Sequence, residues 1–406
     1  MSNRLPILFI LITVSLDAMG IGLILPVMPD LIQEVGGIEL SAAALWGGVL
    51  AASFAVMQFL FSPTIGNLSD RFGRRPVLLI SLIVMTLDYI VMAVAGTIWL
   101  LLAGRIVGGI AAATHSTAFA YMADITDKDK RAQNFGLISA GFGIGFILGP
   151  MLGGLLAGLD PRAPFIAAAC LAAANFVFGY FILPESLPPE NRRSFHWRRA
   201  NPLGGFMNIG ALPGVKWLLV VMLAYQISGF VYPAIWAYYT QAAFGWDARM
   251  IGLSLAAYGV AYAVVQGGLI RIILPWLGEV RAIYFGFGIN ILAMLGYGFV
   301  SEGWIALVLV VFAAGGAIVA PALQGVMSRA AGNDQQGELQ GVLASLSAVA
   351  TIISPLMMTQ AFFWFTREDA QIFLPGAPFL LASVLMLLAM AIYFIIQLGP
   401  QTANAP

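Results

Sequence analysis

The chain has 406 residues, of which 60% are hydrophobic and 9% are charged, and its mean hydropathy is +0.91. A soluble domain carries about 25% charged residues, so this composition excludes a soluble globular protein and indicates a polytopic α-helical membrane protein. The net charge is zero and the only cysteine is Cys170, so nothing points to nucleic-acid binding and no intrachain disulfide is possible.

Apolar runs long enough to cross a bilayer recur along the chain. Six fall at residues 6–28, 43–65, 77–95, 97–123, 133–158 and 163–183, and six more at 216–241, 249–274, 282–300, 304–328, 339–362 and 376–398. We therefore predict an all-α fold of twelve transmembrane helices, with an N-terminal six-helix bundle (1–183), a linker (184–215) and a C-terminal six-helix bundle (216–406). In the linker, Ser194–Arg199 mixes aromatic and cationic side chains, which is typical of a short helix on the membrane surface.

Lysines and arginines are unevenly distributed over the predicted loops. If the N-terminus is cytoplasmic, all nineteen lie on the cytoplasmic side except Arg162, Arg249 and Arg367, which lie outside, and Arg105, which is within a span. An excess of these residues marks cytoplasmic loops, so both termini are predicted to be cytoplasmic. The first run is too long for a cleavable signal and is predicted to be the first transmembrane helix.

The stretch Gly66–Pro76, between the second and third runs, carries one acid, Asp70, and three arginines, Arg71, Arg74 and Arg75. Gly66 and Gly73 are expected to let the backbone turn between two helix ends. Asp70 and Arg74 are four residues apart and would face the same side of a helical turn. The stretch is either a basic loop that only fixes the topology or a specific charged signature.

Three charged residues fall inside predicted spans: Asp17, Asp88 and Arg105. An ionised group there costs about 2.5–3.5 kcal/mol on insertion scales, so it must be paired, protonated or exposed to a wet cavity. One interpretation is a fixed Asp–Arg pair that holds helices together. We favour a switching arrangement, in which Arg105 stabilises whichever carboxylate is ionised while the other carries a proton.

The fifth run is rich in glycine around Pro150, with Gly141, Gly143, Gly145, Gly149, Gly153 and Gly154. Small residues at this density let another helix approach closely, and the proline bends the helix. The second half has no such charges but offers neutral polar and aromatic residues in its spans: Gln226, Tyr232, Trp236, Tyr262, Gln266, Asn290 and Gln324. These residues favour substrate recognition, although each of them could equally form a helix–helix hydrogen bond.

Landmark residues recur at an offset of 205 positions. The pairs are Gly73 and Gly278, Trp99 and Trp304, Gly136 and Gly341, and Pro150 and Pro355. This offset predicts two halves related as a parallel repeat. Because Pro275 occupies the position that corresponds to Asp70, we interpret the halves as sharing architecture but not charge chemistry.

These motifs resemble the major facilitator superfamily. Gly66–Pro76 is similar to its signature between helices 2 and 3, Arg105 with Gly108 and Gly109 resembles its helix-4 motif, and Gly145–Gly154 resembles the helix-5 motif of its drug–proton antiporters. Leu16–Pro29, Leu87–Tyr89, Ser301–Trp304 and Pro321–Ser328 are similar to the tetracycline exporters of Gram-negative bacteria.

The resemblance implies a monomer in the bacterial inner membrane that exports a small amphiphilic drug in exchange for protons, by alternating access. It requires no cofactor beyond the proton gradient, and a tetracycline-like drug could be carried as its Mg²⁺ chelate. The resemblance implies four sets of functional residues. Proton coupling is implied for Asp17, Asp88 and Arg105, and a cytoplasmic gate for Gly66, Asp70, Arg71, Gly73, Arg74, Asp124 and Arg131. An antiporter motif is formed by Gly145, Gly149, Pro150, Gly153 and Gly154, and a substrate cavity is lined by Gln226, Trp236, Tyr262, Gln266 and Asn290. For the gate, we expect Arg74 to pair with Asp124 and Asp70 to dock at the N-terminus of a helix that starts near Gly337.

The chain departs from tetracycline exporters of this type at three positions. Asn290 stands where they carry an acid in helix 9, Tyr262 where they carry a histidine in helix 8, and Phe230 where they carry a second glutamine in helix 7. The alternatives are therefore an exporter of another drug or metabolite, a proton-coupled importer, or a non-transporting receptor. An enzyme is not expected, because the sequence has no nucleophile–base set, metal-binding spacing or nucleotide-binding loop.

Overall fold

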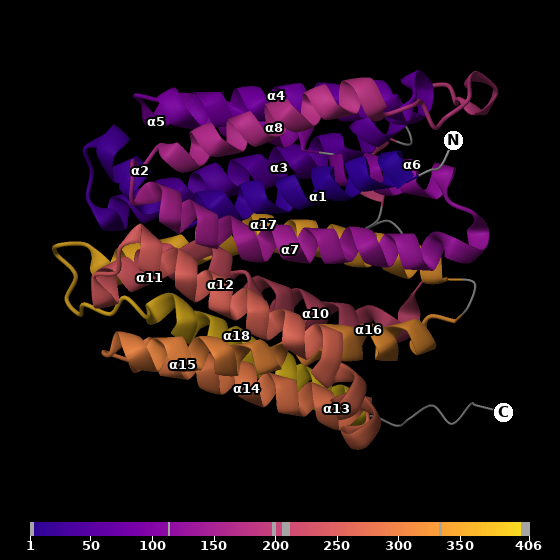
Figure 1. Ribbon diagram of the computed structural model, residues 1–406. Coiled ribbons are helices and arrows are strands. Elements are labelled where there is room, and N and C mark those ends of the chain that lie inside the picture. Colours follow the sequence, from indigo (N-terminus) through magenta and orange to yellow (C-terminus); the bar gives the residue numbers. More distant parts are fainter. Residues whose placement is uncertain (1–3, 113, 197–199, 205–211, 333–334, 399–406) are drawn as a thin grey trace. The chain divides into compact units, whose positions relative to one another are not determined.

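The computed structural model describes residues 4–112, 114–196, 200–204, 212–332 and 335–398, and it contains helices but no strand in these ranges (Figure 1). Twelve of the described helical segments are long and apolar enough to cross a membrane, and each coincides with one of the predicted runs. The prediction of an all-α polytopic protein with twelve spans is therefore confirmed.

The chain forms two compact units. One comprises Met1–Pro202 and Trp246–Gly259, and the other comprises Leu203–Gly245 and Val260–Pro406. The first half of the chain contains α1 (Arg4–Ile24), α2 (Met28–Gly36), α3 (Leu40–Phe72), α4 (Arg74–Val94), α5 (Ile98–Ala111), α6 (Thr114–Ile125), η1 (Lys128–Lys130), α7 (Arg131–Ala157), α8 (Ala163–Ile182) and η2 (Pro189–Asn191).

The second half contains η5 (Pro213–Val215), α10 (Lys216–Gly229), α11 (Val231–Phe244), α12 (Ala248–Val264), η6 (Val265–Leu269), α13 (Ile270–Leu277), α14 (Glu279–Phe299), α15 (Gly303–Ala314), η7 (Gly315–Ile318), α16 (Val319–Ala330), α17 (Gln336–Thr366) and α18 (Ala377–Leu398). Several spans consist of two or three successive elements. The span Ala248–Leu277, for example, contains α12, the π-helical turn η6 and α13.

The stretch Gly66–Pro76 is almost entirely helical rather than a loop. α3 continues to Phe72 and α4 begins at Arg74, so that Gly73 alone separates them. Gly73 has a φ of 107°, which glycine adopts at little cost, and the chain reverses there as predicted. The prediction of a second turn at Gly66 is wrong, because Gly66 lies within α3 and polar side chains extend a helix beyond its apolar run without ending it.

The structure places the repeated landmarks at matching positions. Gly278 has a φ of 71° and alone separates α13 from α14, as Gly73 separates α3 from α4. The tryptophans at 99 and 304 are each the second residue of a helix, α5 and α15. The prolines at 150 and 355 lie inside α7 and α17. The parallel repeat read from the 205-residue offset is therefore confirmed at the level of single helices.

α7 lies alongside α1 (Figure 1), and four glycines on one face of α7 pack directly against that helix. They recur every fourth residue, which places them on the same side of the helix: Gly141, Gly145, Gly149 and Gly153. A Cβ added at any of them would meet atoms of α1 between Leu11 and Leu23. A Cβ at Gly143 meets no described atom within 4 Å. Gly154 makes a second close approach, because a Cβ there would overlap the carbonyl oxygen of Ala248 in α12. The close approach predicted from the glycine-rich motif is therefore confirmed at these five glycines.

Candidate functional site

Asp88 of α4 and Arg105 of α5 form an ion pair in the interior of the first unit, with side chains only 3% and 11% exposed. The glycines on either side of this pair make room for the carboxylate. A Cβ at Gly108 would lie 2.7 Å from Asp88 Oδ2, and one at Gly104 would lie 3.0 Å from Oδ1. Sequence reasoning identified Gly108 but not Gly104, although the two are four residues apart on one helix face.

Arg105 has a second contact, because its guanidinium lies 5.1 Å from the centre of the Phe54 ring of α3. Asp88 Oδ2 accepts the hydrogen bond from Arg105, whereas Oδ1 is buried without a hydrogen-bond partner among the described residues. The ion pair therefore satisfies one oxygen of the carboxylate and leaves the other able to accept a further hydrogen bond or a proton.

Asp17 of α1 is the second intramembrane acid, and its Oδ1 is also buried with no hydrogen-bond partner among the described residues. Tyr89, the neighbour of Asp88 on α4, packs against α1. Its hydroxyl lies against Gly20 of α1, where a Cβ would overlap it. The structure therefore pairs two of the three predicted proton-coupling residues, Asp88 and Arg105, and places Tyr89, to which the sequence had assigned no role, against α1 three residues after Asp17.

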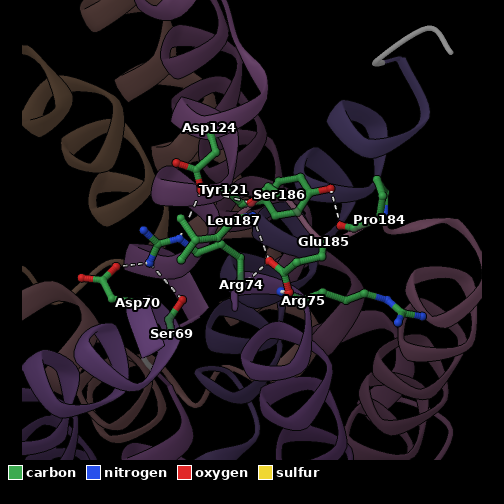
Figure 2. Close-up of polar contacts among 10 residues, drawn as sticks. All are labelled: Ser69, Asp70, Arg74, Arg75, Tyr121, Asp124, Pro184, Glu185, Ser186 and Leu187. Atoms are coloured by element: carbon green, nitrogen blue, oxygen red, sulfur yellow. Dashed lines mark hydrogen bonds and ion pairs between the residues drawn. The ribbon is translucent and has the colours of Figure 1, made fainter. Parts of the chain in front are cut away.

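A second cluster surrounds Arg74, at the turn between α3 and α4 (Figure 2). Arg74 Nη1 lies 2.6 Å from Asp70 Oδ1 and donates to Ser69 Oγ at 3.1 Å. Arg74 Nε donates to Asp124 Oδ2, near the end of α6, at 3.2 Å. We call Ser69, Asp70, Arg74 and Asp124 the Arg74 cluster. The predicted pairing of Arg74 with Asp124 is confirmed, as is the placement of Asp70 beside Arg74.

Of the other residues predicted for this cluster, Gly73 forms the turn directly before Arg74, and three lie apart from the cluster. Arg71 is exposed, and its guanidinium lies 5.0 Å from the centre of the neighbouring Phe72 ring. Arg131 is exposed at the first residue of α7, and the described ion pairs of the Arg74 cluster do not include it. Gly66 lies within α3, with open space around the position of its missing side chain.

The segment that follows α8 contacts the Arg74 cluster directly, which sequence reasoning did not anticipate. Glu185 accepts hydrogen bonds from the backbone N–H groups of Arg74 and Arg75, and Ser186 donates one to Asp124 (Figure 2). The short surface helix predicted for Ser194–Arg199 is wrong for Ser194–His196, which are not helical, and its remaining residues lie outside the described ranges.

The second unit has an ion pair between Glu279, the first residue of α14, and Arg329, close to the end of α16. Arg329 Nη1 donates to Glu279 Oε1 at 2.6 Å, and Nη2 donates to Oε2. These residues follow Arg74 and Asp124 by the repeat offset of 205 positions, with the two charges exchanged. The interpretation that the second half had lost this charge chemistry is therefore wrong, and the offset applied to charged residues would have identified the pair.

Two of the predicted cavity residues are packed inside the second unit. Trp236 is 2% exposed, and its ring centre lies 5.2–6.2 Å from those of four other aromatic residues: Tyr232, Tyr239, Tyr297 and Phe379. Asn290 is also buried, and its Nδ2 donates to the carbonyl oxygens of Gly286 and Gly316 at 3.0 and 3.2 Å. In this structure both side chains connect helices of the unit interior.

The remaining predicted cavity residues are more accessible. Gln266 lies in the π-helical turn η6, and its Nε2 donates to the carbonyl oxygen of Ala317 in η7 at 3.0 Å and to the Tyr262 hydroxyl at 3.3 Å. Tyr262 is 42% exposed, and Gln226 of α10 is half-buried. π-helical turns occur frequently at functional sites, so the Tyr262–Gln266 pair is the strongest candidate for ligand contact in this unit.

Twelve membrane-spanning helices with a buried acid–arginine group and an ion-paired turn define a polytopic membrane transporter. The chain belongs to the major facilitator superfamily, whose family model matches residues 10–355. It is 42% identical to the class C tetracycline resistance protein of Escherichia coli over 88% of this chain and 90% of that protein. It is 37% identical to the class B protein of Escherichia coli over 86% of both chains. Among solved structures, a bacterial homologue of the human lysosomal transporter Spinster has the same fold, with a TM-score of 0.78 and 15% identity over 100% of this chain and 99% of that one.

Proposed function

We propose that this chain exports a tetracycline-like drug across the bacterial inner membrane in exchange for protons, by alternating access and with both termini in the cytoplasm. The similarity to tetracycline resistance proteins over most of their length supports the substrate class. The observation that carries the proton coupling is the ion pair of the buried Asp88 with Arg105, together with a second intramembrane acid, Asp17, whose Oδ1 has no hydrogen-bond partner among the described residues.

One arginine can neutralise only one of the two carboxylates. With Arg105 on Asp88, an ionised Asp17 would be a charge inside a membrane-spanning helix, half-buried and with no described partner for its buried Oδ1, and such a charge is costly inside a membrane. Asp17 is therefore favoured in its protonated form in this arrangement. A change in the Asp88–Arg105 pair, produced by drug binding or by a change in water access, would alter the cost of ionising Asp17. That dependence is what couples proton release to transport.

The drug would contact the accessible polar groups of the second unit. Gln226, Tyr262 and Gln266 offer amide and hydroxyl groups in partly exposed positions, whereas Trp236 and Asn290 are packed in the unit interior. A tetracycline could be carried as its Mg²⁺ chelate, with the cation as part of the substrate. The Arg74 cluster would form the cytoplasmic gate, because its ion pairs hold the ends of α3, α4 and α6 together.

Drug flux in inverted membrane vesicles tests the proposal. Vesicles that contain the protein and are acidified inside should accumulate tetracycline, and vesicles without the protein should not. The Asp17→Asn and Asp88→Asn variants should lose this uptake, while Asp160→Asn, at an exposed acid between α7 and α8, should retain it. Accumulation driven by an alkaline lumen would mean that drug and protons move in the same direction, which contradicts antiport.

A second candidate is export of a different drug. It is favoured by Tyr262, because a neutral phenol hydrogen-bonded to Gln266 replaces a protonatable group at a candidate ligand-contact position. Growth of a drug-sensitive host that expresses the chain, tested against several antibiotic classes and cationic dyes, separates the two. Protection against tetracyclines supports the first candidate, and protection against another class without tetracyclines supports the second.

A further inference from the structure

We propose that the segment Pro184–His196, which we call the strap, is a working part of the cytoplasmic gate, and that Glu185 is the positioning residue that holds Arg74 in place. The inference rests on the proposed function, because it assigns the strap a role in transport. Sequence reasoning assigned these residues to a linker. In the structure, hydrogen bonds join the strap to three helices of the first unit: α3, α4 and α6.

Glu185 accepts hydrogen bonds from the free backbone N–H groups at the start of α4. The first N–H groups of a helix have no partner within the helix, and Gly73, which precedes α4, has no side chain to supply one. Glu185 Oε1 accepts from Arg74 N–H at 2.8 Å, and Oε2 accepts from Arg75 N–H at 3.3 Å. A carboxylate is also favoured at the positive end of the helix dipole. The cap of α4 is therefore supplied by a residue more than a hundred positions further along the chain.

Glu185 and the turn at Gly73 fit together. A Cβ at Gly73 would lie 2.6 Å from Glu185 Cδ, and the φ of Gly73 is one that other residues rarely adopt. Leu187 N–H donates to Glu185 Oε1 at 3.0 Å and holds the same carboxylate from within the strap. The position of the carboxylate is thus fixed from both sides.

The strap also binds the acid that Arg74 binds. Ser186 Oγ donates to Asp124 Oδ2 at 3.0 Å, and Arg74 Nε donates to the same oxygen at 3.2 Å (Figure 2). Near Asp124 on α6, the Tyr121 hydroxyl donates to the carbonyl oxygen of Pro184 at 2.9 Å. Arg74 and Ser186 therefore share one carboxylate oxygen of Asp124, which links the ion pair to the start of the strap.

The far end of the strap is attached to α3. Arg193 N–H donates to the carbonyl oxygen of Asp70 at 3.0 Å, and the buried Asn67 donates through Nδ2 to the carbonyl oxygen of His196 at 2.8 Å. The strap therefore contacts the helix of each gate residue: α3 for Asp70, α4 for Arg74 and α6 for Asp124. Glu185 fixes the backbone of Arg74, and this placement determines whether the guanidinium reaches both acids.

The test compares three variants in proteoliposomes with an imposed pH gradient: Glu185→Ala, Glu185→Gln and the control Glu190→Ala, at an exposed glutamate of the same strap. The measurements are tetracycline turnover at saturation, the half-saturating concentration, tetracycline binding by fluorescence, and thermal unfolding. Glu185→Ala removes both hydrogen bonds to the start of α4 and should lower turnover at least about ten-fold, while binding and half-saturation stay within about two-fold. Glu185→Gln keeps an acceptor and should recover part of the rate, and Glu190→Ala should match the wild type.

Normal turnover of Glu185→Ala would show that the strap is a passive linker and overturn the proposal. A parallel loss of turnover, binding and thermal stability would also overturn it, because that pattern reports a purely structural cap. Failure of the wild-type protein to move tetracycline is a different result and counts against the proposed substrate. In that case amide hydrogen exchange tests whether Glu185 caps α4. The exchange rate at the start of α4 should rise in Glu185→Ala and not in Glu190→Ala. Equal exchange rates in the two variants would contradict the cap.

Discussion

Glu279 and Arg329 reproduce in the second unit the ion pair of Arg74 and Asp124, with the acid and the base exchanged. Each pair joins the first residue of the helix after a positive-φ glycine to the end of a helix about 50 positions later. The position of the ion pair is therefore the same in both halves of the chain, whereas the acid and the base are exchanged. The first pair is embedded in further contacts to Asp70 and Ser69, which gives the two pairs different tolerances to substitution.

The charge order of the second pair should be reversible. Glu279→Arg alone places two cations together and should reduce the yield of folded protein, and adding Arg329→Glu should restore it. Because the Arg329 side chain is 64% exposed, the pair is screened by solvent, and Glu279→Gln should lower the free energy of unfolding by less than about 1 kcal/mol. Membrane yield and thermal unfolding of the four proteins check this, and a double variant no better than the single one would contradict it.

The same exchange in the first unit should fail. Combining Arg74→Glu with Asp124→Arg restores one ion pair but places a carboxylate at position 74 beside Asp70, where Arg74 Nη1 now lies 2.6 Å from Oδ1. We expect transport to fall at least ten-fold, with the Glu279–Arg329 exchange as the matched control. Drug uptake per mole of inserted protein measures both, and equal tolerance in the two units would show that the Arg74 cluster is no more than an ion pair.

The glycines beside Asp88 should be required for proton coupling. Gly108→Ala introduces a methyl group 2.7 Å from the present position of Asp88 Oδ2, so the carboxylate must move relative to Arg105. We expect drug-coupled proton movement to fall at least ten-fold while the protein still inserts in the membrane. Gly136→Ala, in a helix with open space around the site, is the control. Unchanged coupling in Gly108→Ala would show that the ion pair tolerates displacement.

The glycine face of α7 should separate into essential and tolerant positions. Gly145→Ala overlaps the carbonyl oxygen of Ser15 in α1 and should destabilise the protein by about 1–3 kcal/mol through overpacking. Gly143→Ala, two residues away on the other side of the helix, meets no described atom and should be neutral or stabilising by up to about 1 kcal/mol. Thermal unfolding in detergent compares them, and equal midpoints would contradict the assigned α1–α7 interface.

The sequence allowed prediction of features that depend on local chemistry. The twelve spans follow from apolar length, the turn at Gly73 from glycine, and the Arg74–Asp124 pair from the resemblance. Features that depend on tertiary contact were missed or misassigned. Gly66 could not be distinguished from a turn residue without knowing that α3 continues past it. The cap from Glu185 joins residues too far apart in the chain for any local pattern to connect them.

Two further features show where the residues alone were not enough. The Glu279–Arg329 pair was detectable, but a search for identical residues at the repeat offset does not find exchanged charges. The resemblance assigned Trp236 to the substrate cavity, and the surrounding rings of the second unit add that its side chain is packed in an aromatic cluster.

The central claim is that Asp17, the intramembrane acid that is not in the described ion pair with Arg105, carries the proton that is exchanged for drug. The direct measurement is drug-induced pH change in the lumen of acid-loaded inverted vesicles, recorded with a pH-sensitive dye for wild type, Asp17→Asn and the control Asp160→Asn. Wild type and Asp160→Asn should release protons from the lumen when tetracycline is added, and Asp17→Asn should release none although it still binds the drug. Proton release by Asp17→Asn at the wild-type rate would contradict the account.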